Sequence, residues 1–256
     1  FKAYFNLGHV FDRMGEYDEA IQTYKKVLAA RPDSCKAYNK IALAYYHKKV
    51  YDKALAACSR SLDIERHNPQ AWFYQGMIQA VTGDLEAAAE SYSTATKQDP
   101  EYAEAFCNLS AVYRKLKEWA KAKQAAKAAI KCRAVYPEAY YNLGVCYARE
   151  RSPEKAIVAF KKALSQKSGY TKALHGLAGA YHRAGRLDRA RATYGRLLKK
   201  KPDHYRTLYK LGLVLMDEER YEDAVGAFKK AVKSRPGFAP AYKGIADAYH
   251  RAGRPD

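Results

Sequence analysis

Residues 1 to 34 read FKAYFNLGHVFDRMGEYDEAIQTYKKVLAARPDS, and this segment sets a pattern that the rest of the chain follows. Comparing the sequence with itself gives a period of 34 residues, with units that begin at residues 1, 35, 69, 103, 137, 171, 205 and 239. The phase does not slip along the 256 residues. A fixed period of this length predicts an array of stacked units, in which each unit contacts its neighbours.

Two positions of the unit always carry a small residue. The twentieth position is alanine in all seven units that reach it: Ala20, Ala54, Ala88, Ala122, Ala156, Ala190 and Ala224. The eighth position is Gly8, Ala42, Gly76, Ser110, Gly144, Ala178, Gly212 and Ala246. Helices cross at short distance only where the contact lacks bulky side chains, so these positions predict close helix packing.

Large apolar residues complete two helical faces in each unit. Positions four, seven, eight and eleven have the i, i+3, i+4, i+7 spacing of one helical face, and positions twenty, twenty-four and twenty-seven continue that spacing. The twenty-fourth position is aromatic in five of seven units: Tyr24, Tyr92, Phe160, Tyr194 and Phe228. Glycine at residues 15, 83, 185 and 253 and proline at residues 32, 100, 202 and 236 predict the helix ends. Each unit is therefore expected to be a hairpin of two amphipathic helices.

The first unit, with Tyr4, Leu7, Gly8, Phe11, Ala20, Tyr24 and Pro32, resembles the tetratricopeptide repeat signature. The resemblance covers the whole chain and implies an all-α fold, a right-handed superhelical solenoid of helix-turn-helix repeats. We expect a single array over residues 1–256, made of repeats 1–34, 35–68, 69–102, 103–136, 137–170, 171–204 and 205–238. The first helix of an eighth repeat then occupies residues 239–256. Because that last helix keeps the apolar residues of an array member, we expect the chain to be a fragment of a longer protein.

Family resemblance also implies that the first helix of each repeat lines a concave wall, with positions two, five, six, nine, twelve and thirteen free to bind. Many of the residues at positions two, six and thirteen are basic or amide-bearing, and the following are our candidates for partner binding: Lys2, Asn6, Arg13, Lys36, Lys40, Asn108, Lys115, Asn142, Arg149, Lys172, Arg183, Arg206, Lys210 and Arg251. Such side chains bond peptide backbones and carboxylates. Tyr74, Gly176 and Gly244 interrupt the asparagine series at position six.

Other polar and aromatic residues of the first helices have two interpretations. Phe5, Phe73, Tyr141, Tyr209, Tyr46, His175, His182 and His250 can pack between adjacent first helices or can anchor a partner side chain. Gln75 and Gln79 fall at normally apolar positions, where they can form satisfied polar contacts in the core, for example with each other, or can mark a bend or a local specificity site. His175 and His182 lie seven residues apart without a third ligand at metal-like spacing, so we expect no metal site.

Charge is distributed unevenly along the chain. The net charge is +19, yet residues 1–102 hold 13 Lys or Arg and 13 Asp or Glu, whereas residues 103–256 hold 33 and 14. This excess favours an acidic protein segment, a nucleic acid or an anionic membrane surface, although scattered lysines on second helices are typical of a solvated surface. The chain lacks an RNA-binding motif, which favours a protein partner over a nucleic acid. It also lacks an apolar run of about 20 residues, so we expect no membrane span.

The sequence favours a non-enzymatic scaffold or adaptor that binds an acidic, extended peptide or helix in the concave groove. No catalytic or cofactor-binding motif is present, so we expect no enzymatic activity and no cofactor. The alternatives are a docking region of a larger enzyme such as a glycosyltransferase, and a helical repeat associated with nucleic acid. The five cysteines are odd in number and lack metal or disulfide spacing, which favours a soluble protein of the reducing cytoplasm. A homo-oligomer formed through the array ends is a further expectation.

Overall fold

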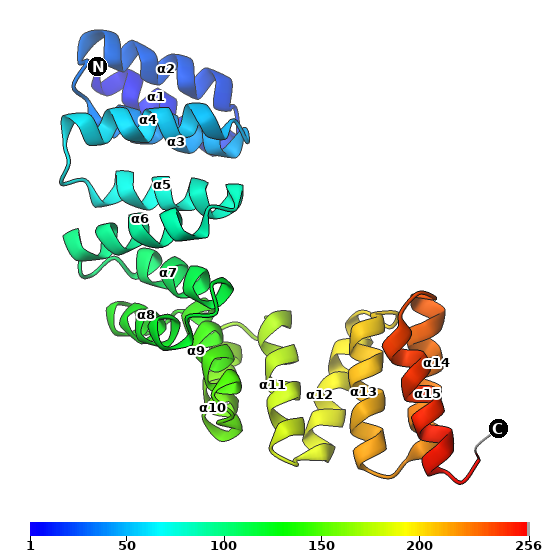
Figure 1. Cartoon of the computed structure of the whole chain (residues 1–256). Coiled ribbons are helices and arrows are strands. Elements are labelled where there is room, and N and C mark those ends of the chain that lie inside the picture. Colours follow the sequence, from blue (N-terminus) through cyan, green and yellow to red (C-terminus); the bar gives the residue numbers. More distant parts are fainter. Residues whose placement is uncertain (255–256) are drawn as a thin grey trace. The chain divides into compact units, whose positions relative to one another are not determined.

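The computed structural model describes residues 1–254, which form fifteen α-helices and no β-strand (Figure 1). The helices group into two compact units, Phe1–Ala134 and Val135–Asp256. The first unit contains α1 (Lys2–Met14), α2 (Tyr17–Ala30), α3 (Cys35–His47), α4 (Tyr51–Ile64), α5 (Pro69–Thr82), α6 (Leu85–Gln98), α7 (Ala103–Lys115) and α8 (Trp119–Cys132). The second contains α9 (Pro137–Arg149), α10 (Pro153–Gln166), α11 (Thr171–Arg183), α12 (Leu187–Lys200), α13 (Tyr205–Asp217), α14 (Tyr221–Ser234) and α15 (Ala239–Arg251).

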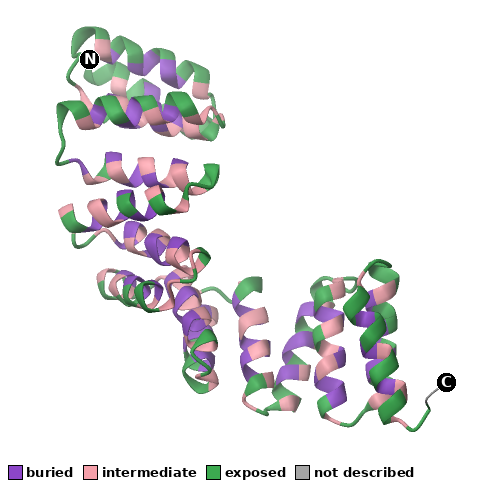
Figure 2. Cartoon of the chain, viewed as in Figure 1, coloured by how far each residue is buried: buried purple, intermediate pink, exposed green. Residues whose placement is uncertain are grey.

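Consecutive helices pair as antiparallel hairpins, and from α3 onward each odd-numbered helix begins at the first residue of a 34-residue unit. We call the odd-numbered helices first helices and the even-numbered ones second helices. The predicted all-α tetratricopeptide-type fold is confirmed. Figure 2 shows that buried residues recur along the helices of both units, as expected for amphipathic helices that pack on several neighbours.

The turn inside each hairpin passes through a left-handed residue at the fifteenth position. Four repeats have glycine there, with φ between 69° and 99°. The other four have Lys49, Lys117, Arg151 and Glu219, with φ between 56° and 64°. This conformation closes the first helix through a backbone bond such as that from the Glu16 N–H to the Phe11 carbonyl, at 3.0 Å.

Aromatic rings at the twenty-fourth position explain why the eighth position is small. A Cβ atom built on Gly144 would lie 2.7 Å from the Phe160 ring, and one on Gly212 would lie 2.4 Å from the Phe228 ring. Gly8 and Gly76 face the rings of Tyr24 and Tyr92 in the same way; the sixth repeat instead combines Ala178 with Tyr194. Repeats two and four have Ala42 and Ser110 at this position, with only Cys58 and Ala126 in place of the ring. In the repeats with glycine at the eighth position, the ring at the twenty-fourth position therefore packs directly on that glycine. We call this contact the ring seat.

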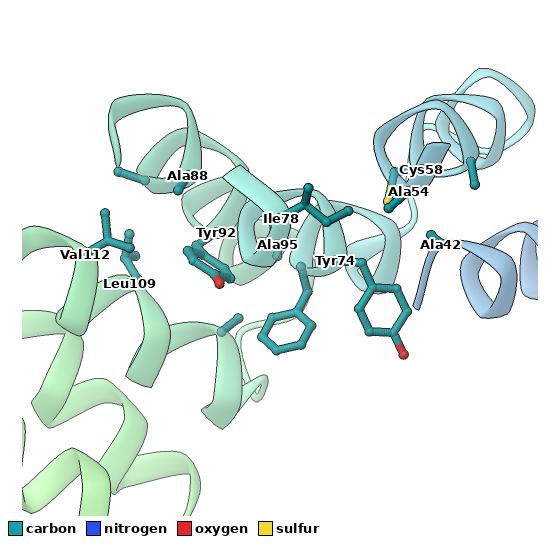
Figure 3. Close-up of a cluster of buried hydrophobic side chains, with 14 of the residues drawn as sticks. Ala42, Ala54, Cys58, Tyr74, Ile78, Ala88, Tyr92, Ala95, Leu109 and Val112 are labelled. Atoms are coloured by element: carbon teal, nitrogen blue, oxygen red, sulfur yellow. The ribbon is translucent and has the colours of Figure 1, made fainter. Parts of the chain in front are cut away.

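The same ring also contacts the sixth position of the following repeat. A Cβ atom on Gly176 would lie 2.5 Å from the Phe160 ring, and one on Gly244 would lie 2.8 Å from Phe228. Asn108 donates a hydrogen bond of 3.3 Å to the Tyr92 hydroxyl. Where the twenty-fourth position holds the small Cys58, the sixth position of the next repeat holds the large Tyr74, and both residues belong to the buried cluster of Figure 3. The interruptions of the asparagine series therefore follow the size and polarity of the preceding ring, and the expectation that position six lies outside the packing set is wrong.

The two glutamines of α5 have different outcomes: Gln79 makes the expected satisfied polar contact and Gln75 does not. The Gln79 side-chain carbonyl accepts a hydrogen bond of 2.7 Å from the Ser91 hydroxyl of α6, so Gln79 is satisfied by the second helix of its own hairpin. The Gln75 Oε1 atom is buried and has no hydrogen-bond partner. A local polar contact inside the third hairpin accounts for Gln79, whereas nothing in the structure explains Gln75.

The Gly144→Ala substitution tests the ring seat. The added methyl group would overlap the Phe160 ring, so we expect the free energy of unfolding to fall by about 1 to 3 kcal/mol. Gly226→Ala is the matched control, because a Cβ atom there meets nothing within 4 Å and alanine stabilises a helix interior by roughly 0.5 to 1 kcal/mol. Urea denaturation followed by circular dichroism measures both; equal midpoints for the two variants would contradict the proposed seat.

Candidate interaction surface on the first helices

The first helices form the inner wall of each compact unit. In the first unit α3 contacts α5 and α5 contacts α7, and in the second unit α9 contacts α11, α11 contacts α13, and α13 contacts α15. Consecutive second helices make no comparable contacts within either unit. A stack whose first helices approach one another more closely than its second helices curves toward the first helices. The outward-facing side chains of these helices make up what we call the first-helix wall.

In the first unit, most of the predicted binding residues are exposed. Lys2, Asn6, Arg13, Lys36 and Lys115 are exposed, and Lys40 is half-buried. Asn108 is also half-buried and bonds to Tyr92, so its amide contributes to repeat packing. The wall of this unit therefore offers isolated cations more than a ladder of amides.

Three of these residues meet at a hollow of about 390 Å³ between the start of α1 and the start of α3. Lys2, Asn6 and Lys36 share its lining with Phe1, Phe5, Val27, Arg31 and Ser34. Arg31 was not among the predicted residues because it lies near the end of a second helix; its guanidinium is 4.0 Å from the centre of the Phe1 ring. The hollow combines aromatic surface with cations, which suits a carboxylate next to an apolar group.

In the second unit, six of the seven predicted residues are exposed: Arg149, Lys172, Arg183, Arg206, Lys210 and Arg251. Asn142 is the exception, since its side chain belongs to a residue that is only 4% exposed. Its expected role as an open rung of the wall is not supported, because a buried amide is occupied by the surrounding protein.

Several acidic residues of the wall contact a basic or polar side chain. Glu104 at position two pairs with Arg133, and Glu138 pairs with Lys167 at 3.1 Å. Asp217 at position thirteen lies 2.7 Å from His182. No ion pair in the described residues involves Lys172, Arg183 or Arg251. On the first-helix wall of the second unit, uncompensated positive charge thus lies on α11 and α15.

Aromatic residues at position five pack inside their own hairpins. The ring centres of Phe73 and Tyr92 are 5.7 Å apart, and those of Tyr209 and Phe228 are also 5.7 Å apart. The same residues contact the residue that precedes the next first helix, as Phe73 contacts Tyr102 at 4.9 Å. Packing therefore accounts for these rings. They pack against the residues at positions twenty-four and thirty-four of their own repeat, and not between adjacent first helices as expected.

His175 takes the place of this aromatic ring in the sixth repeat. Its ring centre lies 6.5 Å from that of Tyr194 and 5.4 Å from that of His204. The Thr207 hydroxyl lies 3.3 Å from His175 Nε2 and 2.7 Å from His204 Nδ1, so it bridges the two imidazoles. Burial lowers the pKa of His175, and the neighbouring His204 lowers it further. Among residues 1–254 no group of three or more metal-ligating side chains includes it.

Acid should destabilise the second unit through His175. The pKa of His175 is lowered in the folded state. As the pH falls below about 6.5, His175 is therefore protonated in the unfolded chain before it is protonated in the folded one, and the free energy of unfolding decreases. We expect His175→Phe, which restores the ring found in other repeats, to reduce the drop in the urea midpoint between pH 7.5 and pH 5.5. His250→Gln on the exposed face of α15 is the control. An unchanged pH dependence in His175→Phe would contradict this assignment.

Together the hairpins, their fixed register and the contacts between successive first helices define an α-helical repeat protein. Four family models described as tetratricopeptide repeats or TPR repeats match residues 1–34, 82–117, 107–171 together with 209–256, and 147–211. The chain belongs to the tetratricopeptide repeat family.

Similar proteins agree with this assignment. The general transcriptional corepressor trfA of Dictyostelium discoideum is 32% identical over 90 residues, which are 35% of this chain and 6% of the corepressor. The APC/C hetero-tetramer Cut9-Hcn1 contains a chain with a TM-score of 0.72 and 16% identity, over 94% of this chain and 48% of that chain. YrrB, described as a TPR protein with an unusual peptide-binding site, has a TM-score of 0.65 and 20% identity, over 74% of this chain and 97% of YrrB.

The matched segments represent 4% to 28% of the length of the curated relatives, so this chain corresponds to a small part of those proteins. At the identities of these two structures, the likeness establishes the fold alone. Within residues 1–254, the structure contains no helix with the length and apolar character needed to cross a membrane.

Proposed function

We propose that this chain is a non-catalytic scaffold that binds an acidic, extended segment of a partner protein along the first-helix wall, chiefly in the second unit. The observation that supports the proposal most directly is the set of exposed cations on successive first helices. Lys172 and Arg183 lie on α11, Arg206 and Lys210 on α13, and Arg251 on α15. An extended peptide that crosses these helices can place carboxylates near several of them at once.

Aromatic neighbours hold two of these cations close to the helix surface. The Arg206 guanidinium is 5.6 Å from the Tyr205 ring centre, and the Lys210 ammonium is 5.8 Å from the Tyr209 ring centre. Such contacts restrict the side chains before a ligand arrives, which reduces the entropy lost on binding. Peptide binding is also what the printed description of YrrB ascribes to that protein, and it fits this use of the fold.

Two buried groups, one thiol and one phenol, are in a state that supports a role without catalysis. Burial raises the pKa of the Cys58 thiol to about 12, so this cysteine remains protonated at neutral pH. Burial also raises the pKa of the Tyr194 hydroxyl to about 12. These groups fill space between helices and are not activated for chemistry.

Charge reversal on the wall tests the proposal. We expect a fluorescein-labelled peptide of alternating Glu and Gly to bind the chain, and Arg183→Glu combined with Arg206→Glu to weaken binding by about tenfold or more. Affinity should fall as the salt concentration rises from 50 to 300 mM, since screening weakens exposed ion pairs. Fluorescence anisotropy provides the measurement.

Lys161→Glu combined with Lys162→Glu is the control, because both residues are exposed on the second helix α10. Equal losses in the two double variants would mean that only net charge matters. Tighter binding of a single-stranded DNA 20-mer than of the peptide would favour the nucleic acid alternative over the protein scaffold.

Self-association is a second proposal, supported by an apolar stripe on α1. Tyr4, Leu7, Val10 and Met14 are 45%, 44%, 50% and 63% exposed. In several other repeats the residues at these positions belong to clusters of packed apolar side chains, as Leu174 and Leu177 do, so the exposed surface of α1 suits the end of a second copy of the chain. We expect Leu7→Glu with Val10→Glu to shift sedimentation velocity profiles from dimer to monomer; a wild-type chain that is monomeric at about 100 µM contradicts the proposal.

A further inference from the structure

A trench lies on the other side of the second unit, between the second helices α12 and α14. It has a volume of about 550 Å³ and continues into a neighbouring hollow of about 850 Å³, because Leu198, Leu208 and Lys230 line both. Its floor is formed by leucines of α12 and α13, among which Leu198 and Leu211 are only half-buried. The trench therefore presents aliphatic surface to the solvent.

Its walls are open because two helix-interior residues lack side chains. Gly195 of α12 and Gly226 of α14 both line the trench. A Cβ atom at either position would meet nothing within 4 Å, so packing does not require glycine there. Glycine in a helix interior costs roughly 0.5 to 1 kcal/mol relative to alanine, and neither residue has the positive φ that would explain it.

The repeat register shows that this opening belongs to one place in the array. Gly195 occupies position twenty-five and Gly226 occupies position twenty-two of their repeats. Other repeats have Lys25, Ser59, Ser93, Lys127, Lys161 and Lys229 at position twenty-five, and Gln22, Ala56, Glu90, Gln124, Val158 and Ala192 at position twenty-two. The trench is thus a local departure from the array and not a property of every hairpin.

The charges of the rim differ between its two ends. At one end Arg191 and Arg220 are paired with Asp188, Glu218 and Asp223. At the other end Lys230 and Lys233 form no ion pair among residues 1–254, and the exposed Lys199, Lys200 and Lys201 end the neighbouring helix. Asp203 is the acidic residue in the lining at this lysine end. A ligand for this trench needs an apolar face and carboxylates at one end.

We propose that the trench binds an acidic amphipathic helix of a partner protein. Two parallel helices separated by a groove accept the side-chain row of a third helix, and aliphatic side chains of that row would cover Leu198 and Leu211. Its carboxylates would lie at Lys230 and Lys233. A flat anionic membrane fits less well, because it would cover the whole rim, including Glu222 at the end opposite the lysines, whereas a helix can place its carboxylates at Lys230 and Lys233 alone. This site is separate from the first-helix wall.

A defined probe tests the proposal on the whole chain. The probe is a fluorescein-labelled 16-residue peptide with leucines on one helical face and glutamates on the flanks, measured by fluorescence anisotropy. Gly195→Gln combined with Gly226→Gln fills the trench, and we expect it to weaken binding by about tenfold or more. Glutamine is already present at position twenty-two in α2 and α8, as Gln22 and Gln124, and it favours helix, so the variant should remain folded. Circular dichroism verifies this.

Charge variants complete the test. Lys230→Glu with Lys233→Glu should weaken binding by a similar factor, whereas Lys161→Glu with Lys162→Glu on α10 should change it by less than about twofold. Undiminished binding by the glycine-to-glutamine variant overturns the proposal. So does a loss confined to Arg183→Glu with Arg206→Glu, because the probe would then lie on the first-helix wall.

Lipid vesicles test whether the trench binds a membrane. Co-sedimentation with phosphatidylserine vesicles that survives filling of the trench but is abolished by the Lys230 and Lys233 reversals, without any binding of the peptide, would assign the surface to a membrane and contradict the proposal.

Discussion

In five of the seven complete repeats, the aromatic ring at the twenty-fourth position is the contact on which the hairpin and its junction with the next hairpin depend. Phe160 illustrates it: its ring lies against Gly144 of its own hairpin and against Gly176 of the next. One buried side chain therefore determines how closely two helices of a repeat approach and what the following repeat can carry. Since protein interiors are closely packed, a change at any of the three positions must be matched by the others.

This coupling explains which parts of the molecule could be predicted from the sequence. Helical periodicity and glycine or proline breakers are local signals, so the hairpins and their first residues follow from the 34-residue register. The contents of the wall were harder to predict, because they depend on contacts across repeats. Asn108 binds the Tyr92 hydroxyl sixteen residues earlier. Asn142 is buried. Neither residue differs in type from the exposed Asn6, so composition alone could not separate them.

The array uses its two sides differently. First helices approach one another and present single cations, held in places by neighbouring tyrosines, which suits an extended chain that is recognised through charge. The second helices stand farther apart, and between α12 and α14 the missing side chains of Gly195 and Gly226 expose leucine surface. The repeat register identifies this trench, because the positions of Gly195 and Gly226 carry larger residues in the other repeats.

The left-handed residue of the hairpin turn has a consequence for the stability of the individual hairpins. Lys49, Lys117, Arg151 and Glu219 adopt a conformation that costs an L-amino acid roughly 1 to 2 kcal/mol, whereas glycine adopts it freely. In a linear stack, where each repeat is held by its neighbours, such costs remain local. The four hairpins that turn through these residues therefore carry a backbone cost that the glycine hairpins lack, and two of them, at Lys117 and Arg151, are consecutive in the stack.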